Sequence, residues 1–222
     1  MDAPSPDTPK KAKIGFLLLS AILVATTALL IFGWLAEEVL ESDTARFDEV
    51  VRATVHRLAS PNVTSLMLGF SFLGSVVMQL ALTLVAIFLF LYFHRPRAAL
   101  LLAITMAGAA GLDVVLKLAF HRARPAAFFG TSPNSYSFPS GHALGSLCFY
   151  GALAVILSAR TPRRSTRACI WAVALVLIGM IGLSRIYLGV HYPSDVIAGY
   201  SAAVVWVAAV GFSDRILKFR TS

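Results

Sequence analysis

Long apolar stretches dominate this chain, and short polar segments separate them. A bilayer is crossed by roughly 20 helical residues, so apolar runs of that length predict membrane-spanning helices. We expect six spans, at residues 14–36, 76–93, 98–120, 142–159, 168–187 and 193–213. Only 14% of the residues are charged, against about 25% in soluble domains. The sequence therefore predicts an all-α, polytopic integral membrane protein.

Polar composition divides the chain further. We expect four parts: a disordered cytoplasmic tail at 1–13, the first span and an interfacial helix at 14–60, a core at 61–214 and a cytoplasmic tail at 215–222. The acidic stretch after the first span also carries apolar residues at helical spacing, which is typical of an amphipathic helix lying on a membrane. Gly74 and Ser75 are expected to separate a short interfacial segment from the second span.

The basic residues indicate which side of the membrane each loop faces. Six spans place both termini on one side. The segments on that side hold most of the 19 Lys and Arg residues, namely Lys10, Lys11, Lys13, Arg95, Arg97, Arg160, Arg163, Arg164, Arg167, Arg215, Lys218 and Arg220. Because loops rich in these residues stay in the cytoplasm, both termini are expected there. The net charge of +8 is then mostly a topology signal, and nucleic-acid binding is not expected.

Two connections on the opposite side carry polar groups close to the ends of spans. Charge at such depth is costly, and it usually has a function. The groups are Lys117, Arg124, Ser140, Gly141, His142, Arg185, His191 and Asp195. We expect them to lie together at the outer face as one candidate site.

The residue types in these connections suit a bound phosphate. Fixed cations repel one another unless an anion joins them, and arginine forks together with a lysine match phosphate oxygens. Ser140 is a suitable N-cap, and the free N–H groups of a helix start bind anions. Asp195 can hold one nitrogen of His191 and leave the other nucleophilic. Each motif alone also fits a structural role, but their joint presence favours an anion site with a nucleophile.

These residues resemble the type 2 phosphatidic acid phosphatase (PAP2) superfamily. Its three-part signature KxxxxxxRP, PSGH and SRxxxxxHxxxD is matched at Lys117–Pro125, Pro139–His142 and Ser184–Asp195. The resemblance covers residues 60–213, so the core is expected to be a PAP2-like phosphatase core. It implies metal-independent hydrolysis of a lipid phosphate or pyrophosphate through a phosphohistidine, with no cofactor.

The resemblance also implies a role for each motif residue. His191 would be the nucleophile and Asp195 would orient it, while His142 would protonate the leaving oxygen and later activate water. The phosphate-binding residues would be Lys117, Arg124, Ser140, Gly141 and Arg185.

Three neighbouring residues are expected to have supporting roles. Asp113 lies four residues before Lys117 and could pair with it. His121 and Arg122 flank the first motif and could contact a headgroup or only the interface. No metal site is expected, because the acids before residue 60 are predicted to lie apart from the motifs.

Two other functions stay open on the residues alone. Ser140, His191 and Asp195 could form the triad of an intramembrane serine hydrolase, although that reaction has no use for three cations. A lipid or anion transporter would also place charges within the membrane. A soluble haloperoxidase, another branch of the superfamily, is disfavoured by the six spans.

The expected substrate and partner is a phosphorylated lipid within the membrane. The small size, the outward site and analogy with bacterial family members make undecaprenyl pyrophosphate the first choice. Phosphatidylglycerophosphate, phosphatidate and lipid A phosphate are alternatives, and phosphoryl transfer to another lipid is also open. The same analogy implies a bacterial inner membrane, with the active site facing the periplasm or exterior.

Overall fold

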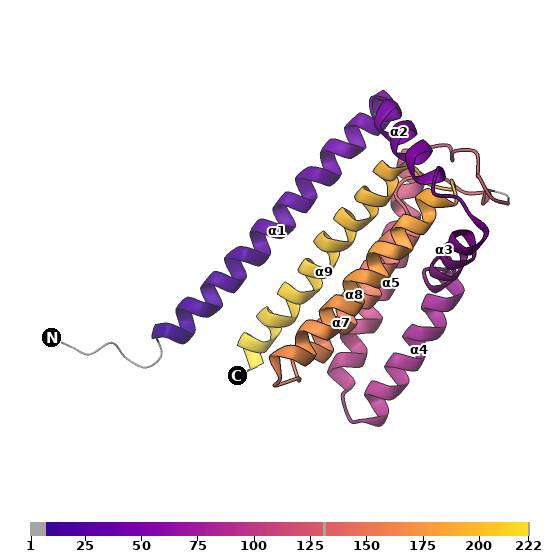
Figure 1. The fold of residues 1–222 in the computed structure, drawn as a ribbon. Coiled ribbons are helices and arrows are strands. Elements are labelled where there is room, and N and C mark those ends of the chain that lie inside the picture. Colours follow the sequence, from indigo (N-terminus) through magenta and orange to yellow (C-terminus); the bar gives the residue numbers. More distant parts are fainter. Residues whose placement is uncertain (1–7, 131, 222) are drawn as a thin grey trace.

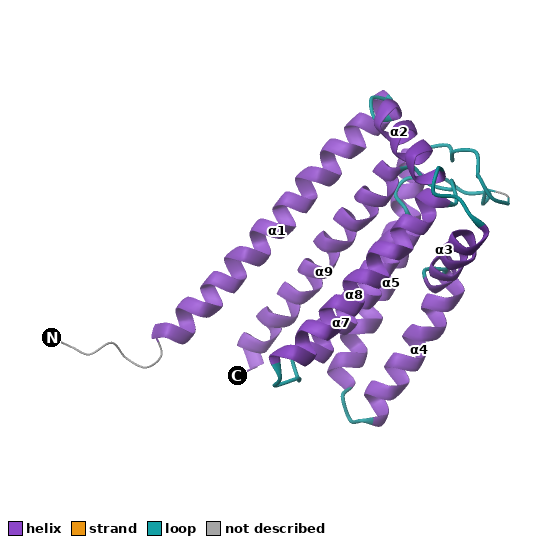
Figure 2. Cartoon of the chain, viewed as in Figure 1, coloured by secondary structure: helices purple, strands orange, loops and turns teal. Residues whose placement is uncertain are grey.

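The computed structural model describes residues 8–130 and 132–221, with side chains for 18–130 and 132–214. Within this part all regular elements are helices, as Figure 2 shows. They are α1 (Thr8–Glu41), α2 (Ala45–His56), α3 (Pro61–Leu73), α4 (Val76–Tyr92), α5 (Pro96–Phe120), α6 (Gly141–Ser146), η1 (Leu147–Gly151), α7 (Ala152–Ser158), α8 (Arg164–Tyr187) and α9 (Pro193–Thr221). The predicted all-α fold is confirmed.

The long helices are apolar enough to cross a bilayer. Among the described residues five helical segments qualify, and α3 with α4 make a sixth if this pair, bent by 52°, is one span. The bend lies at Gly74 and Ser75, where the sequence predicts a division, and Ser75 caps α4 by accepting from the Met78 backbone N–H. Helices α6, η1 and α7 form one span with a π-helical turn in its middle. Five of the six expected spans are therefore confirmed as helices long and apolar enough to cross a bilayer, and the second expected span qualifies only as the α3–α4 pair.

The first helix is longer than predicted. It begins at Thr8, so residues 8–13, expected in a disordered tail, are helical, while residues 1–7 lie outside the described part. Pro9 falls in the first turn, where its missing N–H has no intrahelical partner to lose, and the lysines and alanine that follow are good helix formers. Because no helix breaker intervenes, the helix also passes the expected end at residue 36 and reaches Glu41.

The last helix is longer as well. α9 continues to Thr221, so residues 215–221, expected in a tail, are helical. The sequence there has no proline or glycine to stop the helix after Gly211.

Helix α2 turns two of its four Asp, Glu and Arg residues towards the protein. Asp48 and Arg52 are buried, whereas Phe47 and Val50 are exposed. This orientation is the reverse of that of a soluble surface helix, and it suits a helix whose outer face meets lipid, as the sequence predicts.

The connections are sorted between the two ends of the bundle. The start of α1, the end of α9 and the α4–α5 and α7–α8 turns lie at one end, while α2 and the long α5–α6 connection lie at the other (Figure 1). α1 runs beside α9, and its buried residues Leu35 and Val39 pack with Phe138 and Ala198. The N-terminal helix thus covers the span that follows the third motif.

Candidate active site

His191 lies two residues before the start of α9 and is 1% exposed. Its Nδ1 is 3.3 Å from Oδ2 of Asp195, and its Nε2 is 2.9 Å from Nη1 of Arg124. A guanidinium can only donate, so Nε2 must accept and Nδ1 must carry the proton. The Tyr192 backbone N–H also donates to Asp195 Oδ2, at 2.9 Å, and fixes this carboxylate. The arrangement leaves the imidazole lone pair on Nε2, directed at Arg124.

Burial lowers the pKa values of both His191 and Arg124. Desolvation lowers the pKa of His191 to about 4, in spite of the opposing effect of Asp195. Burial also lowers the pKa of Arg124, and the charges of Asp195 and Asp113 oppose that shift. His191 is therefore a neutral imidazole at pH 7, next to a guanidinium that stays charged.

Arg124 is held by the loop that carries it and by the chain near His191. Its guanidinium donates to the Val190 carbonyl at 2.7 Å, to the Ser135 carbonyl at 2.8 Å and to the Ser135 hydroxyl at 3.0 Å. A cavity of about 460 Å³ adjoins it, lined by Arg124, Pro133, Asn134, Ser135 and Tyr136. The cavity gives a polar approach to the arginine.

Lys117 and the start of α6 meet through Asp113. The ammonium of Lys117 lies 2.7 Å from Oδ2 of Asp113, which is the pair expected from their spacing. A Cβ on Gly141 would come within 2.5 Å of Oδ1 of the same carboxylate, so only glycine fits this approach. Ser140 caps the helix, with its Oγ accepting from the Ala143 backbone N–H. Lys117 is thereby fixed beside the N-terminus of α6.

His142 and Arg185 complete the constellation. Arg185, Lys117 and Arg124 all lie close enough to the imidazole of His142 for their charges to interact with it. Arg185 is buried and donates to the Ser71 hydroxyl of α3. Sequence reasoning missed Ser71, because a serine within an apolar helix gives no local signal. The predicted catalytic and phosphate-binding residues therefore gather at one end of the bundle.

The residues expected to support the motifs differ in their placement. Arg122 donates to Oδ1 of Asp195 at 2.6 Å and to the Ser194 hydroxyl at 2.8 Å, so it lies directly behind the His–Asp pair. His121 is exposed, and its ring meets that of Tyr136 edge-on at 4.6 Å between centroids. Arg122 thus touches a candidate catalytic group, whereas His121 lines the outer loop.

The prediction that the acids before residue 60 lie apart from the motifs is wrong for Asp48. Its buried carboxylate accepts from the Ser194 backbone N–H at 2.9 Å, from the Ser194 hydroxyl at 2.7 Å and from Arg122 at 2.8 Å. Arg52, on the same face of α2, donates to the Ala126 carbonyl at 2.9 Å. The reason is the orientation of α2: Asp48 and Arg52 face the bundle, so these buried charges must find partners there.

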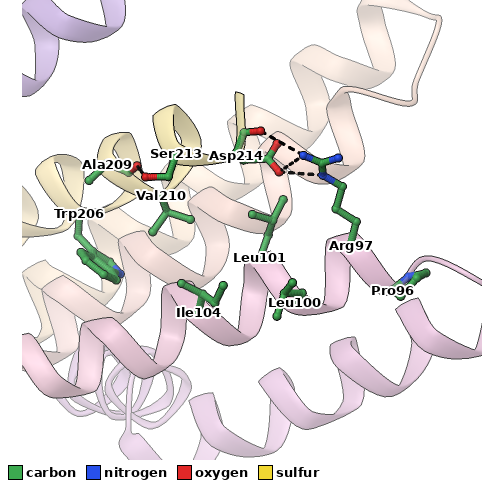
Figure 3. Close-up of a pocket in the computed structure, with 10 residues that line it drawn as sticks. All are labelled: Pro96, Arg97, Leu100, Leu101, Ile104, Trp206, Ala209, Val210, Ser213 and Asp214. Atoms are coloured by element: carbon green, nitrogen blue, oxygen red, sulfur yellow. Dashed lines mark hydrogen bonds and ion pairs between the residues drawn. The ribbon is translucent and has the colours of Figure 1, made fainter. Parts of the chain in front are cut away.

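No group of three or more His, Cys, Asp or Glu residues that could hold a metal occurs in the described part. A larger cavity, of about 660 Å³, lies between α5 and α9 (Figure 3). It is apolar, with Leu100, Ile104 and Trp206 in its lining, and the Arg97–Asp214 ion pair lies beside it. None of the motif residues lines this cavity.

Residues 98–216 match the sequence model of the PAP2 superfamily, and they include all three motifs. The chain belongs to the PAP2 superfamily. Phosphatidylglycerophosphatase B of Bacillus subtilis is 29% identical over 175 residues, which are 78% of this chain and 86% of that protein. An undecaprenyl-diphosphatase of Sulfolobus acidocaldarius is 34% identical over 50% of this chain and 53% of its own length. A lipid A 1-phosphatase of Rhizobium johnstonii is 34% identical over 48% of this chain and 44% of its own length.

Solved structures agree with the sequence match. A transmembrane PAP2 type phosphatidylglycerolphosphate phosphatase from Bacillus subtilis superposes with a TM-score of 0.79 at 28% identity, covering 86% of this chain and 96% of that one. LpxE of Aquifex aeolicus gives a TM-score of 0.57 at 21% identity over 75% of this chain and 95% of that one, which is a likeness of fold. The PAP2 chain described here is a membrane lipid phosphatase, a phosphoric ester hydrolase.

Proposed function

We propose that this PAP2 protein hydrolyses a lipid phosphate through a phosphohistidine on His191. One observation carries the proposal: a buried, neutral imidazole has its proton on Nδ1, held by Asp195, and its lone pair on Nε2. That lone pair faces Arg124, a residue suited to bind phosphate oxygens. A nucleophile and an anion-binding group aimed at each other define where a phosphoryl group would enter.

In the first step Nε2 of His191 attacks phosphorus. The P–N bond forms as the P–O bond to the lipid breaks, and His142 gives its proton to the leaving oxygen. The Nδ1 proton stays in its hydrogen bond, and Asp195 offsets the positive charge of the modified ring. Catalysis of such a transfer is mainly positioning and charge stabilisation.

In the second step a water molecule attacks the phosphohistidine. His142, now neutral, takes a proton from this water, the new P–O bond forms and the P–N bond breaks. The electron pair returns to Nε2, inorganic phosphate leaves, and His142 again holds its proton.

Three cations and the start of α6 are proposed to stabilise the transferred group. Lys117, Arg124 and Arg185 supply positive charge, and the backbone N–H groups after Ser140 supply donors at a helix N-terminus. Ser140 is fully buried and its hydroxyl accepts from a backbone N–H within its own turn. This capping role supports a phosphate-binding residue over the nucleophile of a serine hydrolase.

For the substrate we propose phosphatidylglycerophosphate first and undecaprenyl pyrophosphate, the first choice from sequence, second. The match to the phosphatidylglycerophosphatase of Bacillus subtilis covers 78% of this chain, whereas the match to the undecaprenyl-diphosphatase covers half of this chain. The cavity beside Arg124 is lined by Asn134, Ser135 and Tyr136, whose neutral polar groups suit the hydroxyls of a glycerol headgroup.

For the orientation we propose cytoplasmic termini and an active site at the outer face of a bacterial inner membrane. The end of the bundle that holds the α4–α5 and α7–α8 turns carries the arginines and lysines counted above, and such loops stay in the cytoplasm. The site lies at the opposite end.

The test is phosphate release by the purified protein from four lipids in detergent micelles with EDTA: phosphatidylglycerophosphate, undecaprenyl pyrophosphate, phosphatidate and lipid A. His191→Asn is compared with His94→Asn. His94 is exposed in the α4–α5 turn at φ 56°, a conformation that asparagine tolerates. We expect His94→Asn to release phosphate from phosphatidylglycerophosphate and His191→Asn to release none. Turnover by His191→Asn, or complete loss of turnover in EDTA, would contradict the mechanism.

A further inference from the structure

Asp48, Arg122 and Asp195 form a line of alternating charges that leads from α2 to His191. Arg122 Nη2 is 2.8 Å from Oδ2 of Asp48, and its Nη1 is 2.6 Å from Oδ1 of Asp195. The other oxygen of Asp195 faces Nδ1 of His191 at 3.3 Å. The line therefore ends on the nitrogen opposite the proposed nucleophilic one.

The buried position of Asp48 indicates that this contact is a specific one. Its side chain is 1% exposed and that of Arg122 is 15% exposed. A carboxylate removed from water costs several kcal/mol unless it is paired and fully hydrogen-bonded. Both oxygens of Asp48 are engaged, by the N–H and O–H of Ser194 and by Arg122. The carboxylate is thus satisfied by Ser194, next to Asp195, and by Arg122 of the α5–α6 connection.

Asp48 also limits where Arg122 can lie. On one side the Arg122 guanidinium is held by Asp48 and by the Thr44 hydroxyl, at 3.1 Å. Thr44 lies four residues before Asp48, as the N-cap of α2. The ring of Tyr192 covers its face, 4.1 Å from the centroid. Only the remaining edge is directed at Asp195, so the guanidinium fixes which oxygen of Asp195 is left for His191.

The charge of Asp48 matters beyond the geometry. With Asp48 present, the two carboxylates and one guanidinium sum to one negative charge behind the imidazole. Without Asp48 that sum is zero, and Arg122 would form an ion pair with Asp195 alone. A positively charged phosphohistidine would then be less well stabilised.

We propose that Asp48 of helix α2 is a positioning residue for the reaction, acting through Arg122 on Asp195 and His191. The proposal rests on the proposed function, because it takes His191 as the nucleophile. It assigns to the interfacial helix a part in catalysis as well as in membrane contact. Because Asp48 and Arg122 are not expected to touch the phosphate, the effect should fall on kcat and leave KM unchanged.

The first comparison is Asp48→Asn with Glu49→Gln, measured as phosphate release from phosphatidylglycerophosphate. Glu49 is the adjacent acid of α2, exposed and paired with Arg52, so its change removes the same charge without touching Arg122. For Asp48→Asn we expect kcat to fall about 10- to 100-fold with KM within about twofold, since small misplacements at the reacting atoms have effects of this size. Glu49→Gln should keep wild-type kcat and KM. If Asp48→Asn behaves like Glu49→Gln, or changes KM alone, the proposal is wrong.

A double-mutant cycle separates positioning from a general weakening of the fold. If Asp48 acts through Arg122, Asp48→Asn combined with Arg122→Gln should lose no more kcat than Arg122→Gln alone, within about threefold. Losses that multiply would show that the two residues act independently, which contradicts the proposal.

A third variant covers the case in which Asp48→Asn does not purify as a folded protein. Ser194→Ala removes the hydroxyl that binds both Asp48 and Arg122 but leaves every charge in place. We expect an approximately 3- to 10-fold lower kcat at unchanged KM, and a wild-type kcat would refute the proposal. The His191→Asn variant distinguishes a failure of the proposed function from a failure of the Asp48 proposal. If it is active the proposed function fails, and if it is inactive while the Asp48 variants match wild type, only the present inference fails.

Discussion

Replacing Asp195 with asparagine tests the orientation of the nucleophile. Oδ1 of Asp195 accepts from Arg122 at 2.6 Å, so in Asp195→Asn the amide oxygen must face that guanidinium. The amide NH₂ group then faces His191 Nδ1 and the Tyr192 N–H. Because NH₂ can only donate, it cannot accept the proton on Nδ1, while Arg124 still donates to Nε2. The imidazole therefore loses the contact that holds its nucleophilic tautomer and orientation.

The size of the effect follows from the lost charge. Asp195 is fully buried, and its Oδ2 lies 3.3 Å from the ring that becomes positively charged. At an effective dielectric constant of about 20, two unit charges at that separation attract by about 5 kcal/mol. Each 1.36 kcal/mol of barrier corresponds to about a factor of ten in rate. We therefore expect kcat to fall by about 10³ to 10⁴.

The assay is steady-state phosphate release from phosphatidylglycerophosphate in mixed micelles, with kcat and KM determined separately. Asp43→Asn is the matched control, because Asp43 is an exposed acid in the turn before α2. Size-exclusion profiles and melting curves show whether each variant is folded. A folded Asp195→Asn variant that keeps more than a tenth of wild-type kcat would refute the reasoning.

Four further outcomes are expected. Burial lowers the pKa of His191 to about 4, so kcat/KM should hold as the pH falls to 5 and drop only as it passes about 4, and an acid limb near 6.5 would contradict this. In the unfolded chain the same imidazole takes up its proton near pH 6.5, so the free energy of unfolding should decrease as the pH falls from 6.5 to 4. In Gly74→Ala the new Cβ would clash with the Ile181 side chain and lie 3.0 Å from the His142 ring, so kcat should fall roughly 10- to 100-fold, whereas Gly69→Ala, which meets nothing within 4 Å, should match wild type. Arg185→Met should lower kcat/KM about 10²- to 10³-fold by removing a buried cation, and activity within tenfold of wild type would exclude Arg185 from phosphate binding.

Much of the fold follows from local sequence. Apolar runs of bilayer length locate the spans, Pro193 and Ser140 locate two helix starts, and Gly74 locates the bend between α3 and α4. The ends of α1 and α9 were harder to predict, because polar residues of good helix propensity extend a helix beyond its apolar part. The π-helical turn at 147–151 has no composition signal, since such turns depend on packing.

The candidate site was predictable where its residues lie in motifs at span ends. The Lys117–Asp113 pair follows from i,i+4 spacing on one helix. The contacts of Asp48 could not be predicted in this way, because Ser194 is 146 residues further along the chain. The amphipathic pattern of the segment that carries Asp48 predicted its helical structure correctly but not the direction of its polar face, which depends on lipid covering the other side.

The most direct test of the central claim is to trap the phosphoenzyme. The purified protein is mixed with ³²P-labelled phosphatidylglycerophosphate, quenched in alkali, where phosphohistidine is stable, and digested to locate the label. We expect an acid-labile label on the peptide that contains His191 and none in His191→Asn. An acid-stable label on the peptide that contains Ser140, or a label that persists in His191→Asn, would contradict the account.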